Sequence, residues 1–252
     1  MCFGKSCENK LVRGVEGFML SLMKIHRLPV LFLLLLGNPV SAEEKDGFES
    51  IFDGTLKNWE GDPEYWKAEN GTLVGEVRAD NLLKQNSFII WRGGELADFE
   101  LKLEYRVSSE GNSGINYRSI DVPGVKYAMQ GYQDDIDGKD SWSGQNYEER
   151  GRQFLAYRGQ SVVLKPGAGP VVEKELGDRA ELQKKVLKND WNQVHIIAKG
   201  NLLQHFTNGV LMSEVRDDDP EKRKPSGLLG VQVHVGPPMK IEYRNILVKR
   251  LK

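Results

Sequence analysis

Apolar and charged residues alternate along much of this chain, and this period-two pattern limits the fold more than any other feature of the sequence. In Phe99–Val107 every odd-numbered residue is apolar and every even-numbered residue is charged. Successive side chains of a β-strand point to opposite faces, so such a strand buries one face and exposes the other to solvent. Further short runs follow from Phe48 onward, separated by turn dipeptides such as Asn208 and Gly209. The pattern predicts an all-β sandwich of two antiparallel sheets.

Two segments depart from this alternation. Residues 178–187 are rich in helix formers and place Leu182, Val186 and Leu187 at helical spacing, which predicts one short surface helix. Between residues 137 and 153 the composition changes to Gly, Ser, Asp, Asn and Glu, which predicts a long loop. Loops of this length inside a compact domain are usually functional, so we expect part of a binding site there.

The composition is that of an ordinary globular domain. The chain has 252 residues, of which 39% are hydrophobic and 28% are charged, enough for one large domain with a core. Its formal net charge is -1, and the two signs of charge are interleaved along the chain. A nucleic-acid-binding protein carries a basic surface patch, which this sequence does not provide. We therefore exclude nucleic acid as a partner.

The first 42 residues have the pattern of a leader and signal peptide. Lys24 and Arg27 precede an apolar run at 28–36, and small residues at Val40 and Ala42 offer a cleavage site. The run is too short for a membrane span, which needs about 20 residues. We predict cleavage after Ala42 and export of the mature chain to the periplasm or the extracellular space, with no membrane span.

The same segment contains the expected start of translation and both cysteines of the chain. A signal of 42 residues is long, and translation from Met23 would shorten it to residues 23–42, so we expect Met23 to be the true start. The mature protein is then one domain at 43–252. Both cysteines, Cys2 and Cys7, lie in the leader, so the mature chain has no thiol, disulfide or thiolate metal site.

Three pairs of polar residues occupy alternate positions of predicted strands: Asn116 and Arg118, Gln133 and Asp135, and Gln232 and His234. The two members of a pair share one face of the strand, while their apolar neighbours point to the other face. Guanidinium, carboxylate, amide and imidazole groups gathered in this way predict one concave polar face, which can hold a sugar-sized ligand. The alternative is that these are ordinary solvated outer faces, because antiparallel sheets commonly have water on one side.

Nine short motifs follow one another in a characteristic order along the chain. They lie at residues 48–59, 66–75, 98–101, 112–118, 131–136, 190–192, 208–209, 230–234 and 243–246. Their order resembles that of the 3-keto-disaccharide hydrolase family, and the likeness runs from about Phe48 to Val248. The resemblance implies a concanavalin-A-like jelly roll of two antiparallel sheets with the substrate on its concave sheet, in agreement with the predicted strands.

The resemblance also implies a chemistry. Family members are similar to enzymes that cleave glycosides already oxidised to a ketone at C3, by hydrolysis or by elimination followed by hydration. The ketone acidifies the proton on C2, so a base can remove this proton and the substituent on C1 can then leave. Such a site needs a base, donors for the enediolate oxygens and an acid for the leaving oxygen. The implied partner is a carbohydrate, a 3-keto-glycoside.

Four residues are the candidates for catalysis: Asp135, Glu149, His234 and Arg118. Many family members carry Glu and Gln where this chain has Gln133 and Asp135, so the carboxylate of this strand stands at 135. The resemblance implies that Glu149 is a general acid or base, that His234 is a base or metal ligand, and that Arg118 holds a sugar or enediolate oxygen. The alternative for each residue is a structural or solvated role.

Seven further residues are expected to bind the substrate: Asn116, Gln133, Gln232, Tyr147, Trp142, Arg150 and Arg152. Trp142 and Tyr147 lie in the predicted loop, where an aromatic ring can stack on a sugar face. The resemblance puts Arg150 and Arg152 beside Glu149 at the lip of the cleft. The alternative for this run is a solvated charged loop.

A metal cofactor is left open by the sequence. Asp134, Asp135 and Asp137, with Glu148 and Glu149, are oxygen ligands of the kind that calcium takes, but no calcium-loop spacing is present. The resemblance implies a divalent metal ion at the enediolate in some members. No cofactor is therefore certain, and a divalent metal ion stays an option. The oligomeric state is not indicated.

Two other functions compete with an enzyme for 3-keto-glycosides. A non-catalytic carbohydrate-binding module can use the same jelly roll, because fold alone does not fix activity. A two-carboxylate glycosidase needs paired acids on one strand, and no Glu-x-Asp-x-x-Glu run supplies them. Catalysis is favoured if Asp135, Glu149, Arg118 and His234 converge within about 10 Å, whereas a wall of aromatic rings alone favours binding.

Overall fold

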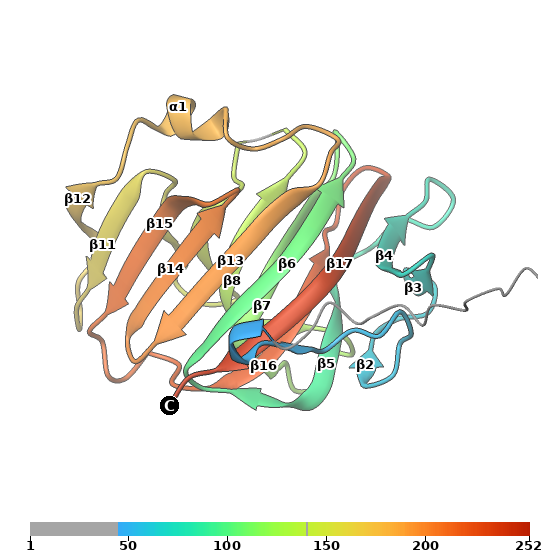
Figure 1. The fold of residues 1–252 in the computed structure, drawn as a ribbon, viewed down its shortest axis with the longest axis horizontal. Coiled ribbons are helices and arrows are strands. Elements are labelled where there is room, and N and C mark those ends of the chain that lie inside the picture. Colours follow the sequence, from blue (N-terminus) through green and yellow to red (C-terminus); the bar gives the residue numbers. More distant parts are fainter. Residues whose placement is uncertain (1–44, 140) are drawn as a thin grey trace, which may run out of the picture. The chain divides into compact units, whose positions relative to one another are not determined.

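Two β-sheets pack face to face in the part of the chain that the structure describes, residues 45–139 and 141–252 of a computed structural model. One sheet has ten strands, in the order β12-β11-β15-β14-β13-β6-β17-β4-β3 with β1 on β17. The other has seven, in the order β10-β9-β8-β7-β16-β5-β2 (Figure 1). Strands β11 and β15 pair in parallel, and the other described pairs are antiparallel. The predicted jelly-roll sandwich is confirmed.

The described strands are between 2 and 12 residues long. The ten-stranded sheet consists of β1 (Glu49–Ser50), β3 (Trp66–Glu69), β4 (Thr72–Val77), β6 (Phe99–Val107), β11 (Gln160–Leu164), β12 (Val171–Glu175), β13 (Asn192–Lys199), β14 (Leu202–Thr207), β15 (Val210–Asp217) and β17 (Met239–Arg250). The seven-stranded sheet consists of β2 (Trp59–Glu60), β5 (Ser87–Leu96), β7 (Asn112–Asp121), β8 (Met129–Asp137), β9 (Asn146–Glu149), β10 (Gln153–Ala156) and β16 (Gly227–Val233). A 3-10 turn, η1 (Lys45–Gly47), and one helix, α1 (Arg179–Gln183), complete the described elements.

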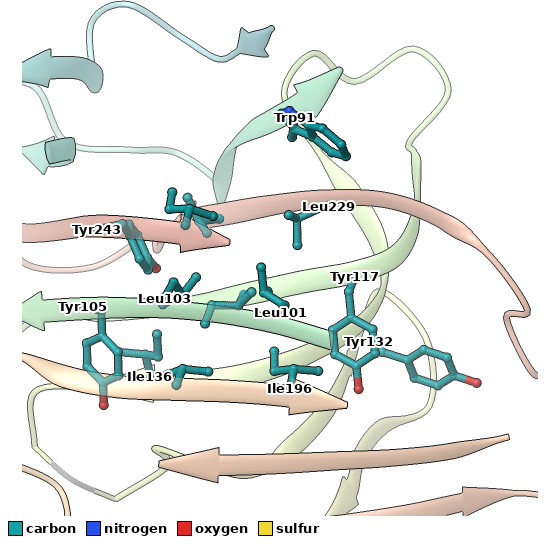
Figure 2. Close-up of a cluster of buried hydrophobic side chains, with 14 of the residues drawn as sticks. Trp91, Leu101, Leu103, Tyr105, Tyr117, Tyr132, Ile136, Ile196, Leu229 and Tyr243 are labelled. Carbon is teal, nitrogen blue, oxygen red and sulfur yellow. The ribbon is translucent and has the colours of Figure 1, made fainter. Parts of the chain in front are cut away.

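The alternation along β6 decides which of its faces is buried. Its five odd-numbered residues, from Phe99 to Val107, are 0–6% exposed, and the charged residues between them face outward. Figure 2 shows Leu101 and Leu103 in one cluster with Tyr117 of the opposite sheet. Fully burying a side chain of this size stabilises a fold by about 1.5–3 kcal/mol. This cluster therefore holds the two sheets together.

The predicted surface helix is confirmed, but it is shorter than the predicted range of 178–187. Helix α1 begins after Asp178, whose carboxylate accepts hydrogen bonds from the backbone N–H groups of Ala180 and Glu181, each at 2.9 Å. Such an N-cap satisfies donors that the first turn leaves without partners. Beyond Gln183 the chain continues as a turn, and Leu182 and Val186 pack together in a small apolar cluster.

The prediction of a loop between 137 and 153 is wrong in part, because strand β9 lies within it and pairs with β8. The residues of β9 are polar on both faces. Asn146 and Glu148 face the interior, where Asn146 contacts His205 and Glu148 pairs with Arg152. A strand whose interior residues are polar lacks the apolar alternation on which the prediction depended.

Strand β7 contains a bulge at Arg118 that changes the direction of its side chain. Arg118 has φ of 44°, and the pairing of β7 shifts register next to it against both β8 and β16. The backbone of β16 approaches the bulge so closely that only a glycine fits at Gly227. A bulge of this kind reorients the following side chain.

The leader, the start at Met23 and the cleavage site at Ala42 lie outside the described residues. In the described ranges, no helix combines the length and the apolar character that a membrane crossing requires.

Replacing Gly227 with alanine tests the bulge. A Cβ atom there would lie 2.5 Å from the carbonyl carbon of Arg118 and 2.5 Å from the carbonyl oxygen of Ser119, so backbone has to move. We expect Gly227→Ala to lower the unfolding free energy by about 2–3 kcal/mol, measured by urea denaturation. Gly169→Ala is the control, since its Cβ meets nothing within 4 Å. Equal stability of the two variants would contradict a tight bulge.

Candidate active site

The outer face of the seven-stranded sheet, turned away from the core, carries most of the predicted polar residues. Ile115 on β7, Tyr132 on β8 and Val231 on β16 enter the core, so the residues between them point outward. Asn116 on β7 pairs in register with Gln133 on β8, and the amide of Gln232 reaches Gln133 from β16. Three distant segments therefore meet on one face.

A cavity of about 600 Å³ opens on this face, and its volume falls within the range of about 300–1,000 Å³ that is typical of ligand pockets. Its lining consists of Asn86, Asn112, Gln133, Asp135, Trp142, Tyr147, Glu149, Arg150, Phe154 and His234. The lining includes carboxyl, amide and imidazole groups as well as aromatic rings. The site can therefore hold a ligand with both polar and apolar surfaces.

Asp135 stands at the cavity end of an amide chain that begins at the fully buried Gln232. The Nε2 of Gln232 donates to the Oε1 of Gln133 at 3.3 Å, and the Nε2 of Gln133 donates to Asp135 at 2.6 Å. Gly114 leaves room for this chain, since a Cβ there would lie 2.4 Å from the Cδ of Gln133. Burial raises the pKa of Asp135 well above its usual range, and nearby acids including Glu149 add to the rise, although the hydrogen bond from Gln133 opposes it.

Glu149 shares the cavity but has different neighbours. The Nδ2 of Asn86 donates to its Oε1 at 3.4 Å, and the Nε of Arg150 lies 4.0 Å from the same oxygen. Burial raises the pKa of Glu149, while Asn86, Arg150, His234 and Gln232 all act to lower it. The pKa values of the two carboxyl groups are therefore shifted by different neighbours.

His234 lies just beyond the last residue of β16 and lines the cavity. Its Nδ1 is 2.6 Å from the carbonyl oxygen of Val235. A carbonyl oxygen only accepts, so Nδ1 donates, and the neutral ring offers Nε2 as an acceptor. Asn86 fixes this turn relative to Glu149, because its Oδ1 accepts from the N–H of Val235 at 3.0 Å.

Three aromatic rings belong to the lining: Trp142, Tyr147 and Phe154. The ring of Phe154 lies 5.3 Å from that of Trp142 and 5.1 Å from that of Tyr147, measured between centroids. Trp142 is 38% exposed, so it is open to a ligand. Apolar ring faces of this kind suit the C–H faces of a sugar.

The sequence of residues 47–249 matches the family model of the 3-keto-alpha-glucoside-1,2-lyase-like domain. The chain belongs to this family. A solved structure from Parabacteroides distasonis, described as a candidate glycosyl hydrolase, is similar with a TM-score of 0.53 and 19% identity, over 82% of this chain and 95% of that one. Another from the same organism has a TM-score of 0.52 and 18% identity, over 81% of this chain and 99% of that one. At these identities the likeness shows the fold alone. No curated protein matches the sequence.

The lyase-like domain brings together most of the residues that the sequence singled out. Those that line its cavity are Gln133, Asp135, Trp142, Tyr147, Glu149, Arg150 and His234. Asn116 and Gln232 lie on the same face but are fully buried and do not line the cavity. Gln232 reaches the site through Gln133, and the side-chain amide of Asn116 has no hydrogen-bond partner among the described residues.

The expectation that Arg118 shares this face is wrong, because the bulge turns its side chain away. Its guanidinium is fully buried, donates to the carbonyl oxygens of Ala97 at 2.8 Å and Gly200 at 2.7 Å, and pairs with Asp98 at 3.0 Å. Ala97 and Asp98 lie in the turn between β5 and β6, which belong to different sheets, and Gly200 lies in the turn between β13 and β14. Arg118 thus links the two sheets at one end of the sandwich.

The expectation that Arg152 stands at the lip of the cleft is also wrong. Its Nη2 and Nη1 bind the carboxylate of Asp217 on β15 at 2.6 and 3.1 Å, and its Nε pairs with Glu148. Asp217 also accepts from the hydroxyl of Tyr132 at 2.5 Å. This network joins β8 and β9 to the opposite sheet, so Arg152 connects the layers instead of facing the ligand.

Three residues of the lining escaped the sequence analysis. Asn112 lies on β7 four positions before Asn116 and on the same face, so the alternation that identified Asn116 could have identified it too. Asn86 precedes β5, and Phe154 lies on β10, and neither falls within one of the nine motifs. No local pattern marks these two, because they reach the cavity only through the tertiary fold.

The acidic residues do not fit a divalent metal ion. Across the described ranges, no three His, Cys, Asp or Glu side chains gather as a metal site requires. Asp134 faces the interior and lies 3.3 Å from His205, and Glu148 pairs with Arg152. Asp137 accepts from the backbone N–H groups of the following turn, including that of Trp142 at 2.9 Å. The acids that the sequence placed together are thus divided between two faces.

Asp135→Asn tests the burial of this carboxyl group. Because the folded-state pKa of Asp135 lies above the ordinary value of 3.8, the protonated carboxyl group contributes its full stability to the fold below pH 3.8. This contribution is lost as the pH rises through the raised pKa. The amide avoids this loss and can still accept the hydrogen bond from Gln133. We expect the variant to gain stability relative to the parent between pH 4 and pH 8, measured by urea denaturation at each pH.

The exposed variant Asp80→Asn is the control for this experiment, and its difference from the parent should not grow with pH. A stability difference between Asp135→Asn and the parent that stays constant from pH 4 to pH 8 would show that Asp135 is ionised in an ordinary way.

Proposed function

We propose that this protein cleaves 3-keto-α-glucosides by elimination across C1 and C2, with Glu149 as the base and Asp135 as the acid. Water then adds to the unsaturated product, so the net reaction is hydrolysis. The observation that carries the proposal is a single cavity with two carboxyl groups, both of raised pKa but in different surroundings. Membership of the lyase-like family supports the substrate class.

The surroundings of the two carboxyl groups assign their roles. Asp135 is buried among other acids, which favours its neutral form, and a neutral carboxyl group can donate a proton. Glu149 has Arg150 nearby and a hydrogen bond from Asn86, and both favour its ionised form, which can accept a proton. Two titratable groups whose environments separate their pKa values are the usual arrangement of an acid and a base.

The proposed elimination moves one proton from C2 to Glu149 and one proton from Asp135 to the leaving oxygen. Glu149 takes the proton from C2, and the electron pair of the C–H bond moves toward the C3 ketone to form an enediolate. The pair then returns to form the C1=C2 double bond as the bond between C1 and the leaving oxygen breaks. Asp135 gives its proton to that oxygen. The products are a 2-hydroxy-3-keto glycal and an alcohol, and water adds to C1 of the glycal in the second stage.

Donors for the enediolate oxygen are available in the same lining. Arg150 offers a guanidinium at the rim, and Asn112 offers a side-chain amide. Burial and the charge of Glu149 raise the pKa of Tyr147, so its phenol keeps its proton and can donate. Donors fixed around a developing negative charge are commonly the largest single contribution to catalysis of this type.

A carbohydrate-binding module without catalysis is the second candidate, and the exposed ring of Trp142 favours it. Such a module would bind sugars through Trp142 and Phe154 and would turn over neither the ketone nor its parent. The buried carboxyl groups favour the enzyme, because binding alone gives no reason to hold two acids in a partly dry cavity.

Substitution of the two carboxyl groups tests the chemistry. We expect Glu149→Gln and Asp135→Asn each to lower kcat/KM on methyl 3-keto-α-glucoside by about 10²–10⁴-fold. Activity of the parent should rise as the pH passes the raised pKa of Glu149 and fall as it passes that of Asp135. Asp135→Asn should lose the fall at high pH, measured as a pH profile of kcat/KM.

The exposed variant Asp80→Asn should retain parental activity. Cleavage of methyl α-glucoside but not of its 3-keto form would refute the mechanism. Sugar binding without cleavage of either compound would identify the binding module.

We also propose that the protein acts outside the cytoplasm, on the strength of the signal pattern in residues 23–42. Expression of the full chain in a bacterial host should place it in the periplasm or the medium. Mass spectrometry of the N-terminus should give Glu43 as the first residue. A cytoplasmic chain that keeps Met1 or Met23 would argue against export.

A further inference from the structure

A second cavity, of about 430 Å³, opens on the outer face of the ten-stranded sheet. It crosses β13, β6 and β17, which lie side by side in Figure 1. Its volume also falls within the usual range for ligand pockets. This cavity shares no lining residue with the candidate active site, which lies on the seven-stranded sheet. The two outer faces of a sandwich point in opposite directions, so the proposed reaction does not use this cavity.

A bulge in β17 shapes the second cavity. The pairing of β17 with β6 shifts register between Arg244 and Leu247, and Asn245 has a left-handed backbone with φ of 52°. Two residues therefore separate Tyr243 and Ile246, which both enter the core, where a regular strand has one. The extra residue turns the side chain of Asn245 to the outer face, where it is exposed and lines the cavity with Leu247.

The imidazole of His195 contributes a hydrogen-bond acceptor to the lining. Its Nε2 lies 2.9 Å from the carboxylate of Glu100. A carboxylate only accepts, so Nε2 donates and the neutral ring offers Nδ1 as an acceptor. Burial lowers the pKa of His195, although the contact with Glu100 opposes this effect, so the neutral ring is favoured. The ring also packs against Phe206, with centroids 5.7 Å apart, which fixes its orientation.

Two side-chain amides add neutral polar groups to the same lining. Gln193 and Asn245 are exposed, and each brings an NH₂ donor and a carbonyl acceptor. The backbone N–H of Gln193 donates to the Oδ1 of Asn208 at 2.8 Å. This bond fixes β13 against the turn that brings Gly209 to the cavity. Both amides are therefore presented to solvent from a backbone that is held in place.

The charged groups of the lining do not select a charged ligand. Lys102 and Glu104 contribute one charge of each sign. The carboxylate of Glu104 accepts from the Nε of Arg244 at 2.5 Å, and the ammonium of Lys102 lies 4.2 Å from the ring centroid of Phe48. Leu247, which pairs in register with Lys102, adds an apolar side chain. The lining therefore suits a neutral ligand that has both hydroxyl groups and an apolar face.

We propose that this cavity is a second carbohydrate-binding site, which takes a neutral oligosaccharide and is formed by Gln193, His195, Asn245 and Leu247. The hydroxyl groups of a hexose can donate to the Nδ1 of His195 and exchange hydrogen bonds with the two amides. Its C–H face can pack on Leu247. Such a site holds the protein on a glycan while the other cavity stays free. The inference does not depend on the proposed reaction, because it uses none of the residues assigned to it.

Titration calorimetry with maltohexaose and cellohexaose, two neutral hexasaccharides of different linkage, tests this site. Asn245→Gly removes the amide and keeps a residue that tolerates the positive φ. We expect it to raise the Kd of the hexasaccharide that binds by about threefold to tenfold, the effect of one lost hydrogen bond. His195→Phe keeps a ring against Phe206 but removes the acceptor, and it should also raise the Kd.

Asn189→Gly is the matched control, because Asn189 is also exposed, has the same φ of 52° and does not line this cavity. It should leave the Kd unchanged, and thermal unfolding shows whether each variant is folded. No measurable binding of either hexasaccharide would overturn the proposal. So would binding that Trp142→Ala abolishes and Asn245→Gly leaves intact, since the sugar would then occupy the candidate active site.

These measurements also separate the second site from the proposed function. If the parent protein cleaves no 3-keto-glycoside but binds a hexasaccharide that Asn245→Gly weakens, the second site stands and the chemistry falls. If cleavage is found and neither hexasaccharide binds, the chemistry stands and the second site falls.

Discussion

The strands that carry the candidate site are held to the opposite sheet by a polar contact inside the sandwich, and the geometry of the cavity depends on it. His205 on β14 lies 3.3 Å from Asp134 on β8 and 3.2 Å from the amide of Asn146 on β9. Asp134 and Asn146 pair in register, and the next residue on each strand, Asp135 and Tyr147, faces the cavity. A buried polar group without a partner costs about 1–3 kcal/mol, so a slip of β9 that takes the amide of Asn146 away from His205 is disfavoured.

Much of the fold follows from alternation alone, since Phe99–Val107 shows its buried face directly in the sequence. The same rule placed Gln133, Asp135 and Gln232 on one polar face, because apolar neighbours such as Val231 point to the other side and enter the core. These assignments depend only on which residues share a face of a strand. That property survives folding wherever the strand is regular.

The rule failed where the strand is irregular or where its interior side chains are polar. At Arg118 a bulge breaks the period of two, and the glycines that allow it, Gly227 and Gly131, lie on different strands. Glu148 resembles its neighbour Glu149 in sequence, but it faces inward because Arg152 bridges it to Asp217. An ionic network between sheets depends on partners that are far away in the sequence, so local patterns do not reveal it.

The chemistry of the site depends on the covering of a sheet face that in most antiparallel sandwiches is wet. Phe88, Ile90 and Met129 form a fully buried cluster on the outer side of the seven-stranded sheet, and Phe88 pairs in register with Gln232. Gln232 is itself fully buried and connects this cluster to Gln133 and thus to Asp135. A carboxyl group beside such a dry region keeps its proton, whereas on a solvated strand it would ionise. The dry surroundings therefore favour the neutral form of Asp135, which is the form that the proposed acid needs.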